Sequence, residues 1–556
     1  MNRRSGGKRQ GVLAVALWLG VLAGHLPAAE PHLIGHWRLA ADGTDSSGNK
    51  LHATPHGVGF GAAAPDDKTP AATFDGRSAR LTVSPDRRLG LGAGDFTVAL
   101  WLRCGGEPGD LVTMYDPKKR FGFNLSLRTN TGVTSSQPNV RQLQFGIDAG
   151  TEPTWADEGR PGNAVLAFAL AVHDGSLYAG TCGNGKDDVG RVYRYEGPGR
   201  WADCGAPDKC NAVSAMAVYR GKLYAATAKY RFAGSALPES GNPNRGGGVY
   251  RYDGGTAWTE VGRLPETEAV GGLVVYKDRL YASSLYRPAG FFRYEAGGRW
   301  EAQPVPDGKR VESLAVHGGH LWATSYDGGR VYRYDGSSWK DYGQLEDNTQ
   351  TYSFAVQRGR LCVGTWPSGK AYRLTDGEAW EDMGRLGGEL EVMGMLVHNG
   401  HLYAGSLPLA EVYRHDGGQS WTRTAQLDKT PDVKYRRAWT MAQHGGRLFC
   451  STLPSGRVYS LTAGACVTHD RELPAGWQHV AAVRRGGVLR LYVGGKLATE
   501  SVRFDPARFD LTNGESLVIG AGAGANYRGA IRDVRLYAGA LGDGEVTRLV
   551  RESGHR

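Results

Sequence analysis

Charged and polar side chains recur at one place in a repeated pattern of this chain, just before a run of apolar residues. Carboxylates and guanidinium groups gathered in one site suit general acid/base chemistry on a glycoside or the binding of an anionic group. The set consists of Glu268, Arg310, Glu312, Gln350, Tyr352, Glu391, Arg436, Arg437 and Trp439. The candidates for catalysis are Glu312, Glu391 and Arg437. These residues come from different copies of the pattern, so the sequence does not fix their distances, and polar solvation of a wet channel is the alternative.

Aromatic residues recur in the longer loops of the same pattern. Exposed aromatic rings around a funnel suit stacking on sugar rings or apolar ligands. The predicted ligand-binding set combines these loop residues with two from the first set: Tyr230, Phe232, Tyr286, Tyr326, Trp366, Tyr352 and Trp439. The alternative is that the loops simply pack on one another.

One motif, written seven times between about Trp155 and Leu461, must position these side chains. Each copy has an apolar strand, a Gly turn, an "LYAG"-like strand, a loop, a "VYRY"-like strand and a Gly-rich turn before a Trp. A period of about 40–50 residues with four strand-like segments is typical of a β-propeller with one four-stranded sheet per blade. The closing Trp appears as Trp201, Trp258, Trp300, Trp339, Trp380 and Trp421.

Two further observations support a closed ring of seven blades. The seventh copy lacks a Trp strand, but Trp155 lies just before the first copy in "TWADEG", which is similar to "RWADCG" at Trp201. We therefore expect Trp155 to supply the outer strand of the last blade, which would leave no exposed strand edge at the seam. In addition, each first strand carries a small residue where strands converge on the axis: Ala169, Ala215, Gly272, Ser313, Ser353, Gly394 and Thr440.

The Gly turns, Tyr and Trp of the repeat resemble the kelch-type propeller unit. The resemblance is incomplete, because the Gly-Gly pair expected after the second strand is replaced by "AGT", "AAT", "ATS" or "AGS". The repeat is therefore described as kelch-like.

The segments on either side of the repeats share a different texture of alternating strands. They contain "FDG" at Phe74–Gly76, "FTVALW" ending at Trp101, "GWQHVA" with Trp477 and His479, and "GAIRDVRLYAGAL" at Gly529–Leu541. In this order the motifs resemble a laminin-G-like, concanavalin A-type jelly roll. Neither segment has enough strands for a sandwich alone, so we predict one jelly roll with the propeller inserted between its two parts.

The predicted organisation is therefore all-β, with a concanavalin A-like jelly-roll sandwich in two sequence segments and an inserted seven-bladed β-propeller. The predicted parts are a signal peptide at 1–29, the jelly roll at 31–148 and 465–556, and the kelch-like propeller at 151–463.

The jelly-roll resemblance also implies two possible kinds of site. The β-glucan-cleaving enzymes of this fold carry alternating carboxylates on one strand, but the chain contains no Glu-x-Asp-x-x-Glu, so that reading is weak. Binding members often hold a structural Ca²⁺, which prefers oxygen ligands. By resemblance the candidate ligands are Asp42, Asp45, Asn49, Asp75 and Asp533. Turn formation and capping by these residues is the alternative.

The first 29 residues predict export. A basic start precedes an apolar run at 11–24 and a small-residue cleavage region at 27–29. The run is too short for a membrane span of about 20 residues, so we expect a cleaved signal peptide, with an uncleaved anchor as the alternative. The protein is then secreted, periplasmic or on the cell surface, without a span after cleavage. The formal charge of +10 includes four cations in this segment, and the other basic residues are scattered, which argues against nucleic-acid binding.

Seven cysteines would enter this oxidising space, so at least one stays unpaired within the chain. Cys204 and Cys210 bracket a short loop and are the predicted disulfide, with Cys182 as a competitor. Four histidines beside Gly turns are interpreted as surface residues rather than metal ligands: His173, His317, His398 and His444.

Two functions remain from the sequence. The preferred one is a secreted binding or adhesion protein that recognises a polysaccharide, a glycoprotein or an extracellular protein. The alternative is a propeller-type glycosidase or polysaccharide lyase acting at the channel mouth. The absence of a recognised enzyme motif favours the first.

Overall fold

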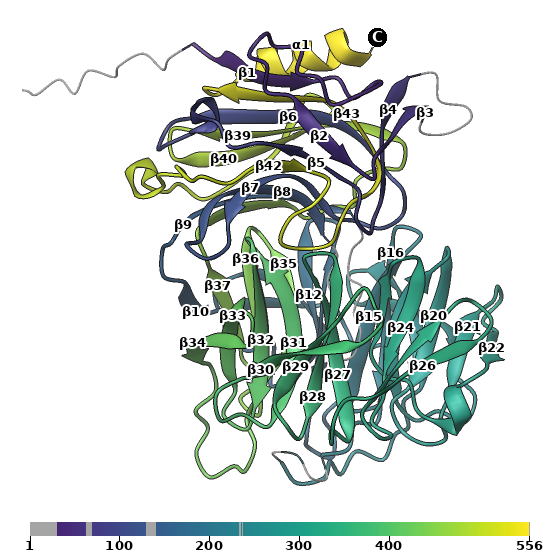
Figure 1. Ribbon diagram of the computed structural model, residues 1–556. Coiled ribbons are helices and arrows are strands. Elements are labelled where there is room, and N and C mark those ends of the chain that lie inside the picture. Colours follow the sequence, from purple (N-terminus) through teal and green to yellow (C-terminus); the bar gives the residue numbers. More distant parts are fainter. Residues whose placement is uncertain (1–29, 63–68, 129–140, 233–234, 236, 555–556) are drawn as a thin grey trace, which may run out of the picture. The chain divides into compact units, whose positions relative to one another are not determined.

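The computed structural model describes residues 30–62, 69–128, 141–232, 235 and 237–554, and nearly all its regular structure is β-strand (Figure 1). The predicted signal peptide at 1–29 lies outside the described residues. None of the described helices is long and apolar enough to cross a membrane.

Strands from the two ends of the chain pair with each other in two sheets. The first sheet has the order β3-β4-β43-β6-β39-β40-β41, with β1 also on β43. Its strands are β1 His32–Trp37, β3 Gly59–Ala62, β4 Pro70–Asp75, β6 Phe96–Cys104, β39 Trp477–Arg485, β40 Val488–Val493, β41 Lys496–Glu500 and β43 Arg528–Ala538.

The second sheet has the order β2-β5-β42-β7-β8-β9-β38. Its strands are β2 Ala53–His56, β5 Arg80–Val83, β7 Asp110–Asp116, β8 Phe121–Arg128, β9 Gln142–Ala149, β38 Ala465–His469 and β42 Leu517–Ile519. Apolar side chains of both sheets form one core that includes Trp37, Phe96, Phe123 and Phe145. The helix α1, Asp543–Gly554, packs on the other face of the first sheet through Val546 and Leu549 (Figure 1).

Between these segments the strands form groups of four antiparallel neighbours, as the repeat predicts, and a single pair, Cys182 with Ala212, joins the first two groups into one eight-stranded sheet. The first two groups are β11 Leu166–His173, β12 Ser176–Cys182, β13 Val192–Gly197 and β14 Arg200–Asp203; and β15 Ala212–Tyr219, β16 Lys222–Ala228, β17 Gly248–Gly254 and β18 Ala257–Arg263. The next three are β19 Val270–Tyr276, β20 Arg279–Ser284, β21 Phe291–Tyr294 and β22 Trp300–Gln303; β23 Leu314–His317, β24 His320–Thr324, β25 Arg330–Tyr334 and β26 Trp339–Gln344; and β27 Gln350–Gln357, β28 Arg360–Trp366, β29 Lys370–Leu374 and β30 Trp380–Arg385. The last two are β31 Glu391–His398, β32 His401–Leu407, β33 Glu411–Gly417 and β34 Ser420–Gln426; and β35 Arg437–His444, β36 Arg447–Leu453, β37 Val458–Thr462 and β10 Thr154–Asp157.

The groups form a closed ring. The first strand of each group contacts the first strand of the next, and β35 of the last group contacts β11 of the first. The last group is completed by β10, whose Trp155 pairs with Leu461 of β37, so the predicted pairing of Trp155 is confirmed. This ring of radial sheets is a β-propeller arrangement.

The closing Trp of the repeat has a common role in the ring. Its indole N–H donates to a backbone carbonyl in the last strand of the preceding group or just after that strand. Examples are Trp258 to Cys204 O at 2.8 Å and Trp421 to Met383 O at 2.7 Å. A Trp therefore covers the outer edge between neighbouring sheets while its one polar atom stays bonded. The same holds for Trp201, Trp300, Trp339 and Trp380.

Some sequence predictions about single residues differ from the structure. His398 is fully buried rather than on the surface, and burial lowers its pKa to about 3. The turn that follows it carries Asn399, whose Oδ1 accepts a hydrogen bond from Asn124 of β8 at 2.9 Å and whose Nδ2 donates to Ile147 O. The turn at this end of β31 is therefore covered by the second sheet.

All seven cysteines lie in the described residues, and each has a free thiol. The structure thus does not show the predicted pair. The Cys204 thiol approaches Ala202 O and the Cys210 thiol approaches Ala212 O, each two residues away.

Candidate functional site

The first strands β27, β31 and β35 begin beside one pocket. Their first residues are Gln350, Glu391 and Arg437, and all three line the cavity, whose volume is about 340 Å³. This entrance lies at the opposite end of β31 from the Asn399 turn. The complete lining is Phe168, Tyr230, Arg231, Ser235, Leu285, Tyr286, Tyr326, Gln350, Tyr352, Trp366, Glu391, Tyr435, Arg437 and Trp439.

The structure brings together six of the seven aromatic residues predicted to bind a ligand. Those six are Tyr230, Tyr286, Tyr326, Tyr352, Trp366 and Trp439. Phe232 does not line the pocket. Its side chain is fully buried and packs edge-on against Tyr230, with the ring centroids 5.0 Å apart, so it supports the wall from behind.

Sequence reasoning missed two aromatic members of the wall, Phe168 and Tyr435. Phe168 stands one residue before the small Ala169, as Tyr352 and Trp439 stand before Ser353 and Thr440. The repeat register therefore contained a signal for Phe168. Tyr435 lies in the segment that leads into β35, where the repeat gives no register.

Glu391 and Arg437 are the buried charged groups of the pocket. Their side chains are 2% and 12% exposed, and Arg437 Nη2 lies 3.8 Å from Glu391 Oε2, beyond hydrogen-bond distance. Arg437 Nη1 donates to Ser235 Oγ at 2.7 Å. Within the described residues, neither Glu391 Oε1 nor Arg437 Nε has a hydrogen-bond partner. Two buried polar atoms of residues that line the pocket therefore lack a hydrogen-bond partner among the described residues.

Burial raises the pKa of Glu391 to about 7, against the lowering effects of Arg437 and the Tyr352 hydroxyl. Burial also raises the pKa of Tyr230 to about 12 and raises the pKa of Tyr326 well above its usual value. Near neutral pH the pocket consequently holds neutral tyrosines and a carboxyl group that is poised between its two protonation states.

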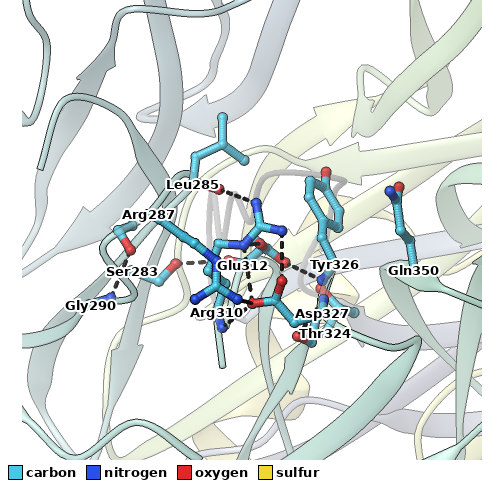
Figure 2. Close-up of polar contacts among 12 residues, drawn as sticks. Ser283, Leu285, Arg287, Gly290, Arg310, Glu312, Thr324, Tyr326, Asp327 and Gln350 are labelled. Atoms are coloured by element: carbon cyan, nitrogen blue, oxygen red, sulfur yellow. Dashed lines mark hydrogen bonds and ion pairs between the residues drawn. The ribbon is translucent and has the colours of Figure 1, made fainter. Parts of the chain in front are cut away.

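Glu312, the other candidate acid, lies outside the lining and stabilises the loop that carries Tyr326 (Figure 2). Its Oε2 accepts from the Tyr326 backbone N–H at 2.9 Å, and its Oε1 lies 3.6 Å from Arg310 Nε. Arg310 in turn donates to Asp327 at 2.9 and 3.2 Å and lies over the Tyr326 ring at 5.6 Å. Arg287 also pairs with Asp327. The structure therefore does not present Glu312 and Glu391 as two carboxylates across one pocket.

The remaining charged residues of the predicted set also serve the surrounding loops. Glu268 pairs with Arg231, whose guanidinium lies over Tyr286 at 5.0 Å. Arg436 donates through Nε to Thr430 O and is not part of the lining.

Three calcium candidates, Asp42, Asp45 and Asn49, share one loop, whereas Asp75 and Asp533 lie elsewhere, and the carboxylates already have protein partners. Asp45 accepts from the backbone N–H groups of three residues, and Asp75 Oδ1 does the same in its own turn. Asp533 pairs with His36 at 2.6 Å and with Arg535. The contacts of Asp45 and Asp75 are those of turn-forming residues, whereas Asp533 is held by ion pairs.

Two candidates remain in the first of these loops. Asp42 accepts from Thr44 N, and Asn49 donates to Leu33 O and Ile34 O. In the part of the chain that the structure describes, no group of three or more His, Cys, Asp or Glu side chains is placed to hold a metal ion. The calcium site stays a prediction that these contacts do not support.

Comparison with known proteins gives a similarity for the end of the chain. A family described as the concanavalin A-like lectin/glucanases superfamily matches residues 415–547, about a quarter of the chain. The match begins in β33 and covers the C-terminal segment that supplies strands to both sandwich sheets. No curated protein matches the sequence.

Solved propeller structures are similar to the chain at low sequence identity. Virginiamycin B lyase from Staphylococcus aureus aligns at 10% identity and a TM-score of 0.44, covering 56% of this chain and 99% of that one. The WD40 β-propeller domain of Doa1 aligns at 10% identity and a TM-score of 0.40, covering 55% and 97%. Each TM-score is below 0.5, and neither similarity assigns a ligand or an activity to this chain.

Proposed function

We propose that this chain is an exported carbohydrate-binding protein whose ligand site is the pocket at the starts of β27, β31 and β35. The observation that carries the proposal is the pocket lining itself: eight aromatic residues surround two buried polar atoms that lack partners among the described residues. Aromatic faces stack on the apolar faces of sugar rings, and a few convergent polar groups fix the orientation of a ligand.

The organisation that we propose for this function is a seven-bladed kelch-like propeller between the two parts of a laminin-G-like jelly roll. The pairing of β38 with β9 and of β39 with β6 supports it, because each pair joins a strand before the propeller to a strand after it. The concanavalin A-like similarity of residues 415–547 is compatible with carbohydrate binding. Export rests on the signal peptide predicted at 1–29.

One observation favours catalysis as a second candidate function. Glu391 lines a cavity, has a pKa near 7 and carries an Oε1 without a partner among the described residues, and these are features of a general acid in a glycosidase or polysaccharide lyase. Against it, Glu312 is directed to the Tyr326 loop, so the expected second carboxylate is not in the lining.

The test is a polysaccharide and glycan array probed with the protein lacking residues 1–29, followed by analysis of each bound glycan for cleavage products. We expect binding without cleavage, and we expect Trp366→Ala to weaken it about fivefold or more, since a stacked ring contributes about 1 kcal/mol or more. Trp366→Phe is the matched variant and should retain most of the affinity. Cleavage of a bound glycan would favour the enzyme, and failure of every glycan to bind would refute carbohydrate recognition and direct attention to a protein ligand.

A further inference from the structure

The two guanidinium groups of the pocket differ in how closely they are paired within the described residues. Arg231 has a carboxylate partner in Glu268, and its side chain is half exposed. Arg437 is buried, its closest carboxylate oxygen is 3.8 Å away, and its Nε has no acceptor. A buried guanidinium without a hydrogen-bonded anion is costly, and a bound anion would remove that cost.

The aromatic walls do not suit a cationic ligand. Arg437 already lies over Tyr435 at 5.8 Å and over Trp439 at 5.9 Å, and Arg231 lies over Tyr286. An ammonium group in the cavity would compete for these ring faces and be repelled by both guanidinium groups. An anion would be attracted by the guanidinium groups of Arg231 and Arg437.

The shape of the available donors also points to a carboxylate. Arg437 Nη1 is used by Ser235, and the other edge of the guanidinium carries Nε and Nη2, of which Nε has no acceptor among the described residues. A carboxylate accepts two parallel N–H bonds from such a fork. The volume of about 340 Å³ is near the lower end of the roughly 300–1,000 Å³ usual for small-ligand pockets, so the cavity suits a chain end rather than a length of polymer.

We propose that the pocket binds the acidic terminal sugar of a saccharide, a uronate-type residue, with its carboxylate on Nε and Nη2 of Arg437 and beside the carboxyl group of Glu391. This inference rests on the proposed carbohydrate-binding function and specifies its ligand. The sugar ring then stacks on the aromatic wall. Glu391 acts as a donor only while it carries its proton, so it couples binding to pH.

The groups that face Glu391 come from several elements. Arg437 lies on β35, Tyr352 lies on β27, and Tyr230 and Tyr326 act on it electrostatically from loops. The tyrosines are neutral at pH 6 to 8 and Arg437 stays charged, so Glu391 is the member of this group that titrates in that range. A carboxylate ligand stays ionised there and favours the protonated form of Glu391.

The experiment is isothermal titration of two oligosaccharides of equal length, one ending in glucuronic acid and the other in glucose. We expect the acidic saccharide to bind wild-type protein at least tenfold more tightly at pH 6. Raising the pH to 8 should weaken its binding about tenfold, because Glu391 is mostly protonated at the lower pH and mostly ionised at the higher one. Arg437→Lys, which keeps the charge but loses the fork, should abolish the preference for the acidic saccharide.

Glu391→Gln tests the proton coupling. This variant keeps a donor at the same position and should bind the acidic saccharide with an affinity that is unchanged between pH 6 and pH 8. Pocket binding of both saccharides with equal affinity would overturn the inference and leave the carbohydrate function standing, whereas binding of neither would count against the function itself. The comparison on wild-type protein requires no variant, so it holds even if a substitution prevents folding.

Discussion

Replacement of Glu391 by Gln should stabilise the protein at alkaline pH. The folded-state pKa of Glu391 is about 7, above its usual value of 4.5, because burial disfavours the ionised form. As pH rises from 4.5 to 7 the unfolded chain releases this proton while the folded protein retains it, so stability is lost over that window and is constant above it. The difference between a pKa of about 7 and the usual 4.5 corresponds to about 3 kcal/mol. Gln does not titrate, so the variant avoids this loss.

The assay is thermal melting of wild type and Glu391→Gln at pH 5 and pH 8. With an unfolding entropy of about 2.1 cal/mol/K per residue over the roughly 300 residues of the ring, most of this energy corresponds to about 4 °C in Tm. The Tm of the variant minus that of wild type should therefore be about 4 °C larger at pH 8 than at pH 5. Glu515→Gln, which removes an exposed carboxylate, is the matched control and should follow wild type. A difference between Glu391→Gln and wild type that is the same at both pH values would refute the reasoning.

Three further predictions concern stability. Phe232→Ala leaves a cavity behind Tyr230 and should cost about 3–5 kcal/mol, seen as a lower Tm, whereas an unchanged Tm would mean that the loop is not packed as described. Glu158→Gln removes the charge that pairs with Arg447 at the seam and should lower the free energy of unfolding by about 1.5–3 kcal/mol, seen as a lower Tm, whereas a Tm equal to that of wild type would show that this ion pair contributes little. Addition of EDTA or Ca²⁺ should leave the Tm unchanged, because the oxygens of Asp45 are filled by protein donors, and a rise with Ca²⁺ would restore the calcium hypothesis.

The repeat allowed much of the ring and its entrance to be predicted. Copies of one motif must present equivalent positions to the same end, which is why Gln350, Glu391 and Arg437 could be grouped without knowledge of their distances. The pairing of Trp155 followed from one shared pattern of residues. These predictions depend on backbone register, which alternation and period specify.

What the sequence could not specify depends on side-chain packing and on loops outside the register. Glu312 occupies the repeat position of Tyr352 and Trp439, yet its carboxylate bonds to the Tyr326 loop instead of facing the pocket. Phe232 lies in an insertion unique to its copy, where no other copy indicates which side chains turn inward. The pKa of Glu391 depends on burial by neighbours from other sheets, which spacing along the chain does not reveal.

The pairing of β6 with β39 has a consequence for synthesis. Trp101 in β6 is opposite His479 in β39, a residue translated about 380 positions later. At roughly 5–20 residues per second, the synthesis of His479 follows that of Trp101 by on the order of 20–80 s. During this time β6 lacks the strand β39 that pairs with it in the folded protein. Apolar strands left open for that time are sites where chains associate wrongly, so the yield of native protein should depend on how fast the ring between the two halves is completed.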